Sequence, residues 1–122
     1  MTRSKLLPAV FLAGVIALLC ALPGGKLQAQ SPREIAITAK RFEFAPNEIT
    51  LKKGETVKLV LTSQDVVHGF YLKPLKIDEI IEHGHPTEVT VTPQVAGRFS
   101  TICDHFCGAN HGNMKMTIVV TE

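Results

Sequence analysis

The residues with the strongest chemical character lie close together near the C-terminus. Two cysteines and a histidine recur at a spacing of four, at Cys103, Cys107 and His111, and Met114 follows them. Thiolate and thioether sulfurs are soft metal ligands, and an imidazole nitrogen also suits copper. This combination predicts a copper site on the segment from residue 103 to residue 114.

Three other interpretations compete with copper. Two cysteines this close form a disulfide by default in an oxidising compartment, although a disulfide leaves His111 and Met114 unexplained. Positions 103, 107 and 111 would share one face of a helix, but the glycines and asparagines of the segment favour a loop. A zinc ion could use the cysteines and the histidine, but zinc sites do not use methionine. Copper accounts for all four side chains.

A second group of polar residues lies upstream, in the segment Asp65-Val-Val-His68-Gly-Phe-Tyr-Leu72. A lone histidine at the start of an expected strand is more often structural than a metal ligand. In a Greek-key sandwich, however, an early strand can end beside the loop that joins the last two strands. His68 is therefore a ligand candidate. For the His83-x-His85 pair, an exposed turn is favoured over a second metal site.

Alternating apolar residues, separated by turn residues, mark the elements that must position these groups. Such alternation predicts half-buried strands, which we expect at residues 35–44, 49–51, 57–61, 67–72, 88–92, 99–103 and 116–120. The apolar phase changes between Ala39 and Phe42, which predicts a bulge. Ile77, Ile80 and Ile81 have the spacing of a single helical turn. About seven strands in one small domain predict an all-β, Greek-key β-sandwich.

The N-terminal residues are typical of an export segment. Arg3 and Lys5 precede an uncharged apolar run from Leu6 to Gly25, as in a signal peptide or a single membrane anchor. Leu27-Gln-Ala29 is an acceptable cleavage site. We therefore expect residues 1–29 to be a signal peptide or membrane anchor. Residues 30–122 would form one exported domain, in the periplasm or on the outer face of the cytoplasmic membrane.

The charge balance excludes one large class of partners. The 122 residues include 13 basic and 11 acidic side chains. Without Arg3, Lys5 and Lys26 of the export segment, 10 basic residues stand against 11 acidic ones, a net charge of −1. The remaining charges form no basic cluster, so nucleic-acid binding has no electrostatic basis. No Ser-His-Asp or paired-carboxylate arrangement indicates a hydrolase.

The two motifs together resemble those of a known family. Asp-Val-x-His-x-Phe occurs at Asp65 to Phe70, and Cys-x3-Cys-Gly-x2-His-x2-Met occurs at Cys103 to Met114. Both are similar to motifs of the cupredoxins, and more narrowly of the CuA domain of cytochrome c oxidase subunit II. The resemblance runs from about Ile35 to Thr121. Because the chain has no tryptophan, it looks more like the short, single-anchor subunit II of B-type oxidases.

This resemblance implies a binuclear copper centre for one-electron transfer. Two cysteines would bridge both copper ions; a histidine and a methionine would complete one ion, and a histidine and a main-chain carbonyl the other. These ligands are, in that order, Cys103, Cys107, His68, Met114, His111 and the carbonyl of His105. The family often has Glu where His105 stands, so only its main-chain carbonyl is carried over.

Two classes of function follow from the resemblance. In the first, the protein has no catalytic site of its own and is the electron-entry domain of a heme-copper oxidase. It would take electrons from a c-type cytochrome and pass them towards subunit I. In the second, it is a stand-alone periplasmic cupredoxin that carries electrons or copper without an oxidase partner. A membrane-bound chain that retains residues 6–25 favours the first class, and a soluble protein beginning at Gln30 favours the second.

Overall fold

The computed structural model describes residues 24–25, 27 and 30–122. Residues 1–23, 26 and 28–29, which make up most of the expected signal peptide or membrane anchor, lie outside the described residues. Within the described part, no helix is long and apolar enough to cross a membrane. The described elements are β1 Arg33–Lys40, β2 Glu43–Ala45, β3 Glu48–Lys52, β4 Val57–Ser63, β5 His68–Leu72, the 3-10 turn η1 Lys73–Leu75, β6 Ile77–Ile81, β7 Thr87–Val91, β8 Gly97–Ile102, the 3-10 turn η2 His111–Asn113 and β9 Lys115–Thr121.

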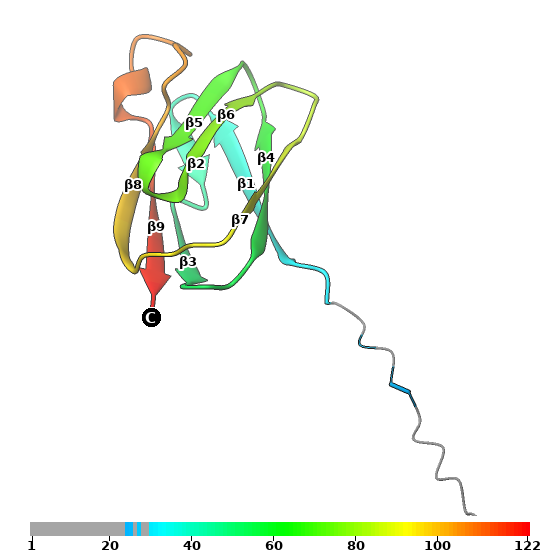
Figure 1. Cartoon of the computed structure of the whole chain (residues 1–122). Coiled ribbons are helices and arrows are strands. Elements are labelled where there is room, and N and C mark those ends of the chain that lie inside the picture. The colour runs from blue at the N-terminus through cyan, green and yellow to red at the C-terminus, as the bar shows by residue number, and fades with distance from the viewer. Residues whose placement is uncertain (1–23, 26, 28–29) are drawn as a thin grey trace, which may run out of the picture.

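The strands form two sheets that enclose one core (Figure 1). One sheet has the order β2-β1-β4-β7 and the other the order β3-β9-β8-β5-β6. Two neighbouring pairs are parallel, β1 with β4 and β3 with β9, and the other pairs are antiparallel. The chain crosses between the sheets several times. The predicted all-β sandwich is therefore confirmed.

Apolar side chains at every second position fill the space between the sheets. Val57, Leu59 and Leu61 of β4 are fully buried, while the residues between them are only half-buried. Phe44 of one sheet and Phe70 of the other meet edge to face, with ring centroids 5.4 Å apart. Such a close-packed core keeps the ends of the strands in fixed positions.

The bulge predicted at residues 39–42 is wrong, because the chain reverses direction there. β1 ends at Lys40, β2 begins at Glu43, and these two residues are paired across an antiparallel hairpin. The reversal places the buried Phe44 opposite Ala39. A tight turn therefore accounts for the change of apolar phase, and no extra residue is inserted into a strand.

The helical turn that the spacing of Ile77, Ile80 and Ile81 would allow is not formed, because these residues form β6. This strand pairs antiparallel with β5, and Ile81 lies opposite His68. Ile77 and Ile81 are buried, whereas Ile80 is 45% exposed. Isoleucine favours extended backbone, and pairing with β5 satisfies the backbone polar groups of the segment. Pairing with β5 therefore determines the conformation of this segment, although the spacing of its isoleucines would also fit a helical turn.

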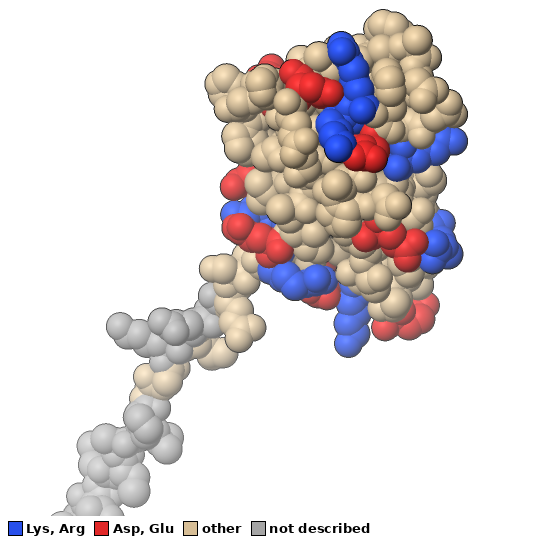
Figure 2. Space-filling model, turned by 180° about the vertical axis from the view of Figure 1, so that it is seen from behind, with Lys and Arg blue, Asp and Glu red and all other residues tan. Residues whose placement is uncertain are grey.

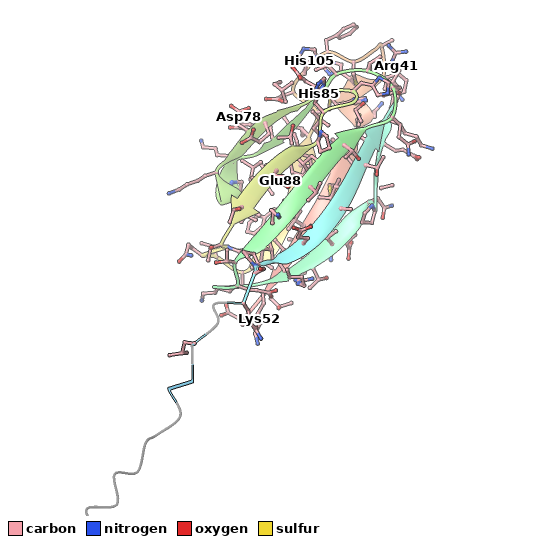
Figure 3. All side chains as sticks on the ribbon, turned by 90° about the vertical axis from the view of Figure 1, so that its right-hand side faces the viewer. Arg41, Lys52, Asp78, His85, Glu88 and His105 are labelled. Atoms are coloured by element: carbon pink, nitrogen blue, oxygen red, sulfur yellow. The ribbon has the colours of Figure 1, made fainter. Side chains whose placement is uncertain are left out.

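The expected copper loop lies at one end of the sandwich. It joins β8 to β9 and is orange in Figure 1. Arg41 and His105 lie at this end, and Lys52 lies at the opposite end (Figure 3). On the face in Figure 2, basic and acidic side chains lie beside one another without forming a basic patch.

Candidate metal centre

Three expected ligands converge at the start of β5 and in the β8–β9 loop. The ligand atoms of His68, Cys103 and Cys107 all lie within 4.8 Å of one another. His68 is fully buried, and each cysteine is only 4% exposed. The two Sγ atoms are 3.6 Å apart, far more than the roughly 2.05 Å of a disulfide. Both thiols are free, so the disulfide interpretation does not describe this structure.

Two further atoms that could bind metal, a thioether sulfur and a carbonyl oxygen, lie near the thiols in the same loop. Met114 is fully buried, and its Sδ lies 3.9 Å from Cys107 Sγ. The main-chain carbonyl oxygen of His105 accepts a hydrogen bond from the Cys103 thiol at 3.1 Å. His105 itself is exposed, at the outer end of the sandwich (Figure 3). Its carbonyl therefore faces the thiols, as the resemblance implies.

His111 lies at the start of η2, in the last part of the loop. Its ring contacts Phe106 edge-on, with centroids 5.1 Å apart, and Phe106 is 70% exposed. His111 is outside the compact group formed by His68 and the two cysteines. The conformation of the loop also excludes a helix over residues 103–111, because only the three residues of η2 are helical there, as a 3-10 turn.

Two imidazole nitrogens in the described chain are buried without a hydrogen-bond partner, His68 Nδ1 and His111 Nδ1. Leaving such a group unpaired costs about 1–3 kcal/mol. A neutral imidazole nitrogen without a proton is also one of the commonest metal ligands in proteins. The two unpaired nitrogens therefore fit a site that receives metal ions.

Asp65 determines which nitrogen of His68 is available. Its Oδ1 lies 2.7 Å from His68 Nε2, and the main-chain N–H of Arg41 donates to Oδ2 at 2.8 Å. Burial alone would raise the pKa of the Asp65 carboxyl, but hydrogen bonds from Arg41, His68 and Val66 outweigh burial and lower the pKa to about 2. An ionised carboxylate can only accept, so Nε2 carries the proton. In the neutral ring, Nδ1 is then free to bind metal.

The Cys107 thiol holds its proton more tightly than an ordinary cysteine. Burial is the largest cause that raises the pKa of Cys107, and together with the adjacent Cys103 thiol it brings this pKa to about 11. Metal ions bind thiolates, so uptake of a metal at neutral pH must release a proton from Cys107. Metal binding at this site is therefore coupled to loss of the Cys107 proton.

Gly69 allows β5 to pass directly against the ligand loop, which is the segment between β8 and β9. Its N–H donates to Cys103 Sγ at 3.4 Å. A Cβ atom at this position would lie 2.7 Å from His105 N and 2.9 Å from Asp104 N, and it would overlap the Asp104 carboxylate. No side chain fits there. The one signal for this role in the sequence is a glycine directly after a candidate ligand histidine.

Arg41 is a second residue that sequence reasoning missed. It lies in the turn between β1 and β2, and its Nε donates to the main-chain carbonyl of Cys107 at 2.7 Å. No motif or spacing connects position 41 with either metal-binding segment. The contact arises only because the β1–β2 turn and the ligand loop meet at the same end of the sandwich.

The His83-x-His85 pair does not join the site. Both residues are exposed in the connection between β6 and β7. Neither belongs to a group of three or more His, Cys, Asp or Glu ligand atoms among the described residues. This placement agrees with the exposed turn that the sequence analysis favoured.

Comparison with known protein families identifies the family of this chain. The family described as a cupredoxin-like domain matches residues 10–120. The chain belongs to this family. A site built from one strand start and the loop between the last two strands is thus found here on a cupredoxin domain.

Two curated relatives of this cupredoxin are oxidase subunits. Cytochrome c oxidase subunit 2 of Thermus thermophilus is 34% identical over 88 residues, covering 72% of this chain and 65% of the relative. Probable cytochrome c oxidase subunit 2 of Streptomyces avermitilis is 39% identical over 72 residues, covering 59% of this chain and 23% of the relative. The predicted resemblance to subunit II is confirmed. The chain spans less than two thirds of the length of these relatives.

A solved structure supports the fold. The periplasmic domain of subunit II of cytochrome oxidase from Bradyrhizobium japonicum superposes on this cupredoxin with a TM-score of 0.69. The match covers 77% of this chain and 87% of that domain, at 20% sequence identity. At this level of identity, the likeness shows the shared fold.

Proposed function

We propose that this cupredoxin is an electron-transfer domain that binds two copper ions between Cys103 and Cys107. One observation carries the proposal. Two free thiols 3.6 Å apart are accompanied by two histidines, His68 and His111, each with an unpaired buried Nδ1. Only His68 lies within the compact ligand group, so the second imidazole is available to a second metal ion.

The remaining donors divide between the two ions. His68 and Met114 would hold one copper with the thiolates, and His111 with the carbonyl of His105 would hold the other. Met114 Sδ lies beside Cys107 Sγ, at 3.9 Å, and the His105 carbonyl lies 3.1 Å from Cys103 Sγ. Copper bound in this way would supply a one-electron redox centre.

The protein contributes rigidity and the exclusion of water. His68 and Met114 are fully buried, and the cysteines are nearly so. Each donor is at the end of a strand or on the loop clamped between β8 and β9. Ligands held by a packed scaffold change position little when an electron arrives, and a small rearrangement favours fast electron transfer.

A single zinc ion is the competing metal. Cys2His2 is a common structural zinc site. Two observations favour copper: the buried sulfur of Met114, which zinc does not use, and the position of His111 outside the compact group. Metal analysis after expression with both metals present therefore discriminates the two.

The oxidase context comes from the relatives. Its relatives are named as subunit 2 of cytochrome c oxidase. We propose that the domain acts in a heme-copper oxidase of this kind, where it would receive electrons from a c-type cytochrome and pass them towards subunit I. It would lie in the periplasm or on the outer face of the cytoplasmic membrane, held by residues 1–29 if they are retained. Residues 30–122 would be the functional domain.

A stand-alone periplasmic cupredoxin is the second candidate. The Leu27-Gln-Ala29 segment, which would release a soluble domain beginning at Gln30 if it were cleaved, favours this role. Such a protein would carry electrons or copper without an oxidase. The two candidates share the metal site and differ in partner and in the fate of the N-terminus.

Expression of the full chain in its native host separates these candidates. The oxidase role predicts that the chain fractionates with membranes, co-purifies with heme and is reduced within seconds by a reduced c-type cytochrome. A soluble, heme-free protein that begins at Gln30 would replace this role with the stand-alone carrier. A copper-loaded protein that accepts no electrons from any donor would contradict the oxidase role and the electron-carrier role, and would leave the copper-carrier role.

A further inference from the structure

We infer that Arg41 is a positioning residue that ties the two halves of the metal site together. The two halves are the segment Asp65 to His68 before and at the start of β5, and the ligand loop between β8 and β9. These segments are far apart in the sequence, and Arg41 belongs to neither. It lies in the turn between β1 and β2, at the same end of the sandwich as His105 (Figure 3), and it is hydrogen-bonded to both segments.

Two hydrogen bonds make this connection. The main-chain N–H of Arg41 donates to Asp65 Oδ2 at 2.8 Å, while Asp65 Oδ1 holds His68 Nε2 at 2.7 Å. The guanidinium Nε of Arg41 donates to the carbonyl oxygen of Cys107 at 2.7 Å. A single residue therefore contacts the carboxylate that orients His68 and the backbone that carries a bridging thiol.

The same turn also presses on the loop by packing. Phe42 follows Arg41, and a Cβ atom on Gly108 would lie 2.8 Å from two carbon atoms of the Phe42 ring. Gly108 has a φ of +147°, a backbone conformation that residues other than glycine rarely adopt. The peptide between Cys107 and Gly108 is thus held by a hydrogen bond and by an aromatic ring. Arg41, Cys107 and Gly108 also line one surface pocket.

The chemistry of arginine suits this role. Its guanidinium is always charged, and its N–H groups are fixed in a plane, so a bond made through Nε has a defined direction. A hydrogen bond from a charged group is stronger than one between neutral groups. The Arg41–Cys107 bond is partly buried, which protects it from competition by water.

The inference predicts an effect in the metal-free protein, independent of copper. Cys107 is 4% exposed, so an alkylating reagent reaches it only when the loop opens. Arg41→Met should increase the alkylation rate of Cys107 by about tenfold, as expected for loss of a charge-assisted hydrogen bond. A faster reaction therefore reports opening of the loop.

Arg33→Met is the matched control. Arg33 lies at the other end of β1 and pairs with Glu55 at 2.9 Å, far from the ligand loop. Its replacement should leave the alkylation rate unchanged. Arg41→Lys is a second variant, which keeps the charge and the aliphatic stem but lacks the Nε–H, and it should also open the loop. Peptide mass spectrometry assigns the modified cysteine in each case.

The copper-loaded protein gives a second readout, which rests on the proposed function. Copper release to a chelator should be about tenfold faster in Arg41→Met and in Arg41→Lys than in the wild type. The midpoint potential should fall in Arg41→Met, because a nearby cation favours the reduced site, and should change less in Arg41→Lys. A positional effect and a charge effect are thereby separated.

The outcomes decide between the two claims. Unchanged alkylation in both Arg41 variants, or an equal increase in Arg33→Met, would overturn the positioning role. A wild-type protein that binds no copper would overturn the proposed function, while the alkylation measurement would still test Arg41. Faster alkylation in the two Arg41 variants alone, with folded far-UV spectra, would support the inference.

Discussion

At the scale of single residues, the site depends on which atom of each side chain is left free. Asp65 holds Nε2 of His68, so Nδ1 is left without a hydrogen-bond partner in a ring that lies beside the two cysteines. His105 offers its carbonyl rather than its exposed ring. The motif spacing predicted these positions, but it could not say which atom would face the metal. That choice is made by neighbours that the sequence does not place.

His68→Ala should remove one donor from the compact group and leave a cavity beside the thiols. We expect copper affinity to fall by at least about 100-fold, more than for loss of a residue that only supports a ligand. His83→Ala and His85→Ala should leave affinity unchanged, because both residues are exposed outside the group. Titration with copper and the optical spectrum measure both effects. Equal losses in all three variants would contradict the assignment.

Asp65 should make the stability of the metal-free protein depend on acidity. Its folded-state pKa of about 2 lies below the unfolded value of about 3.9. Its contribution is therefore fully present above about pH 4 and is lost as the pH falls towards 2. Asp65→Asn should lower the free energy of unfolding by about 1–2 kcal/mol at pH 7. Urea denaturation at several pH values should show the difference in unfolding free energy between wild type and variant shrinking between pH 4 and pH 2. A difference that stays constant over this range would contradict the role of the ionised Asp65 carboxylate.

Met114 should adjust the redox potential more than it holds the metal. Met114→Leu conserves volume at a fully buried position, so the domain should lose less than about 1.5 kcal/mol of stability. The variant should retain two copper ions and shift its midpoint potential, because a weak axial ligand mainly tunes a copper site. Voltammetry with parallel metal analysis tests this. Loss of one copper ion would instead make Met114 an essential ligand.

At the scale of elements, the site depends on how closely β5 approaches the ligand loop. Alternation predicted most strands, because buried positions on a sandwich recur at every second residue, as on β4. It missed β6, whose identity is determined by pairing with β5. It also missed the β1–β2 reversal, which carries Arg41 to the loop. Contacts between elements distant in sequence leave no local pattern, so they could not be predicted.

Gly69→Ala should push the ligand loop away from β5. The added Cβ would overlap Asp104 and the backbone of His105, and such overpacking costs about 1–3 kcal/mol. Gly112→Ala is the matched control in the same loop, because a Cβ there meets nothing within 4 Å. Thermal unfolding and copper loading should both weaken in Gly69→Ala and stay near wild type in Gly112→Ala. Indistinguishable variants would contradict the close approach.

At the scale of the whole molecule, two sheets share one core and place every proposed ligand at the same end. The fold class could be predicted from strand alternation, and the cupredoxin family is shown by the match over residues 10–120. A sandwich of this kind can carry one copper or two. The second thiol, Cys107, is the residue that separates these cases, because a mononuclear site has no use for it.

The copper content of the fully loaded protein tests the central claim most directly. The account predicts two copper ions per wild-type chain, measured by elemental analysis together with an electron paramagnetic resonance spectrum of one electron shared by two copper nuclei. Cys107→Ser should then hold at most one copper ion. One copper per fully loaded wild-type chain, or two in a chain whose cysteines have formed a disulfide, would contradict the binuclear centre.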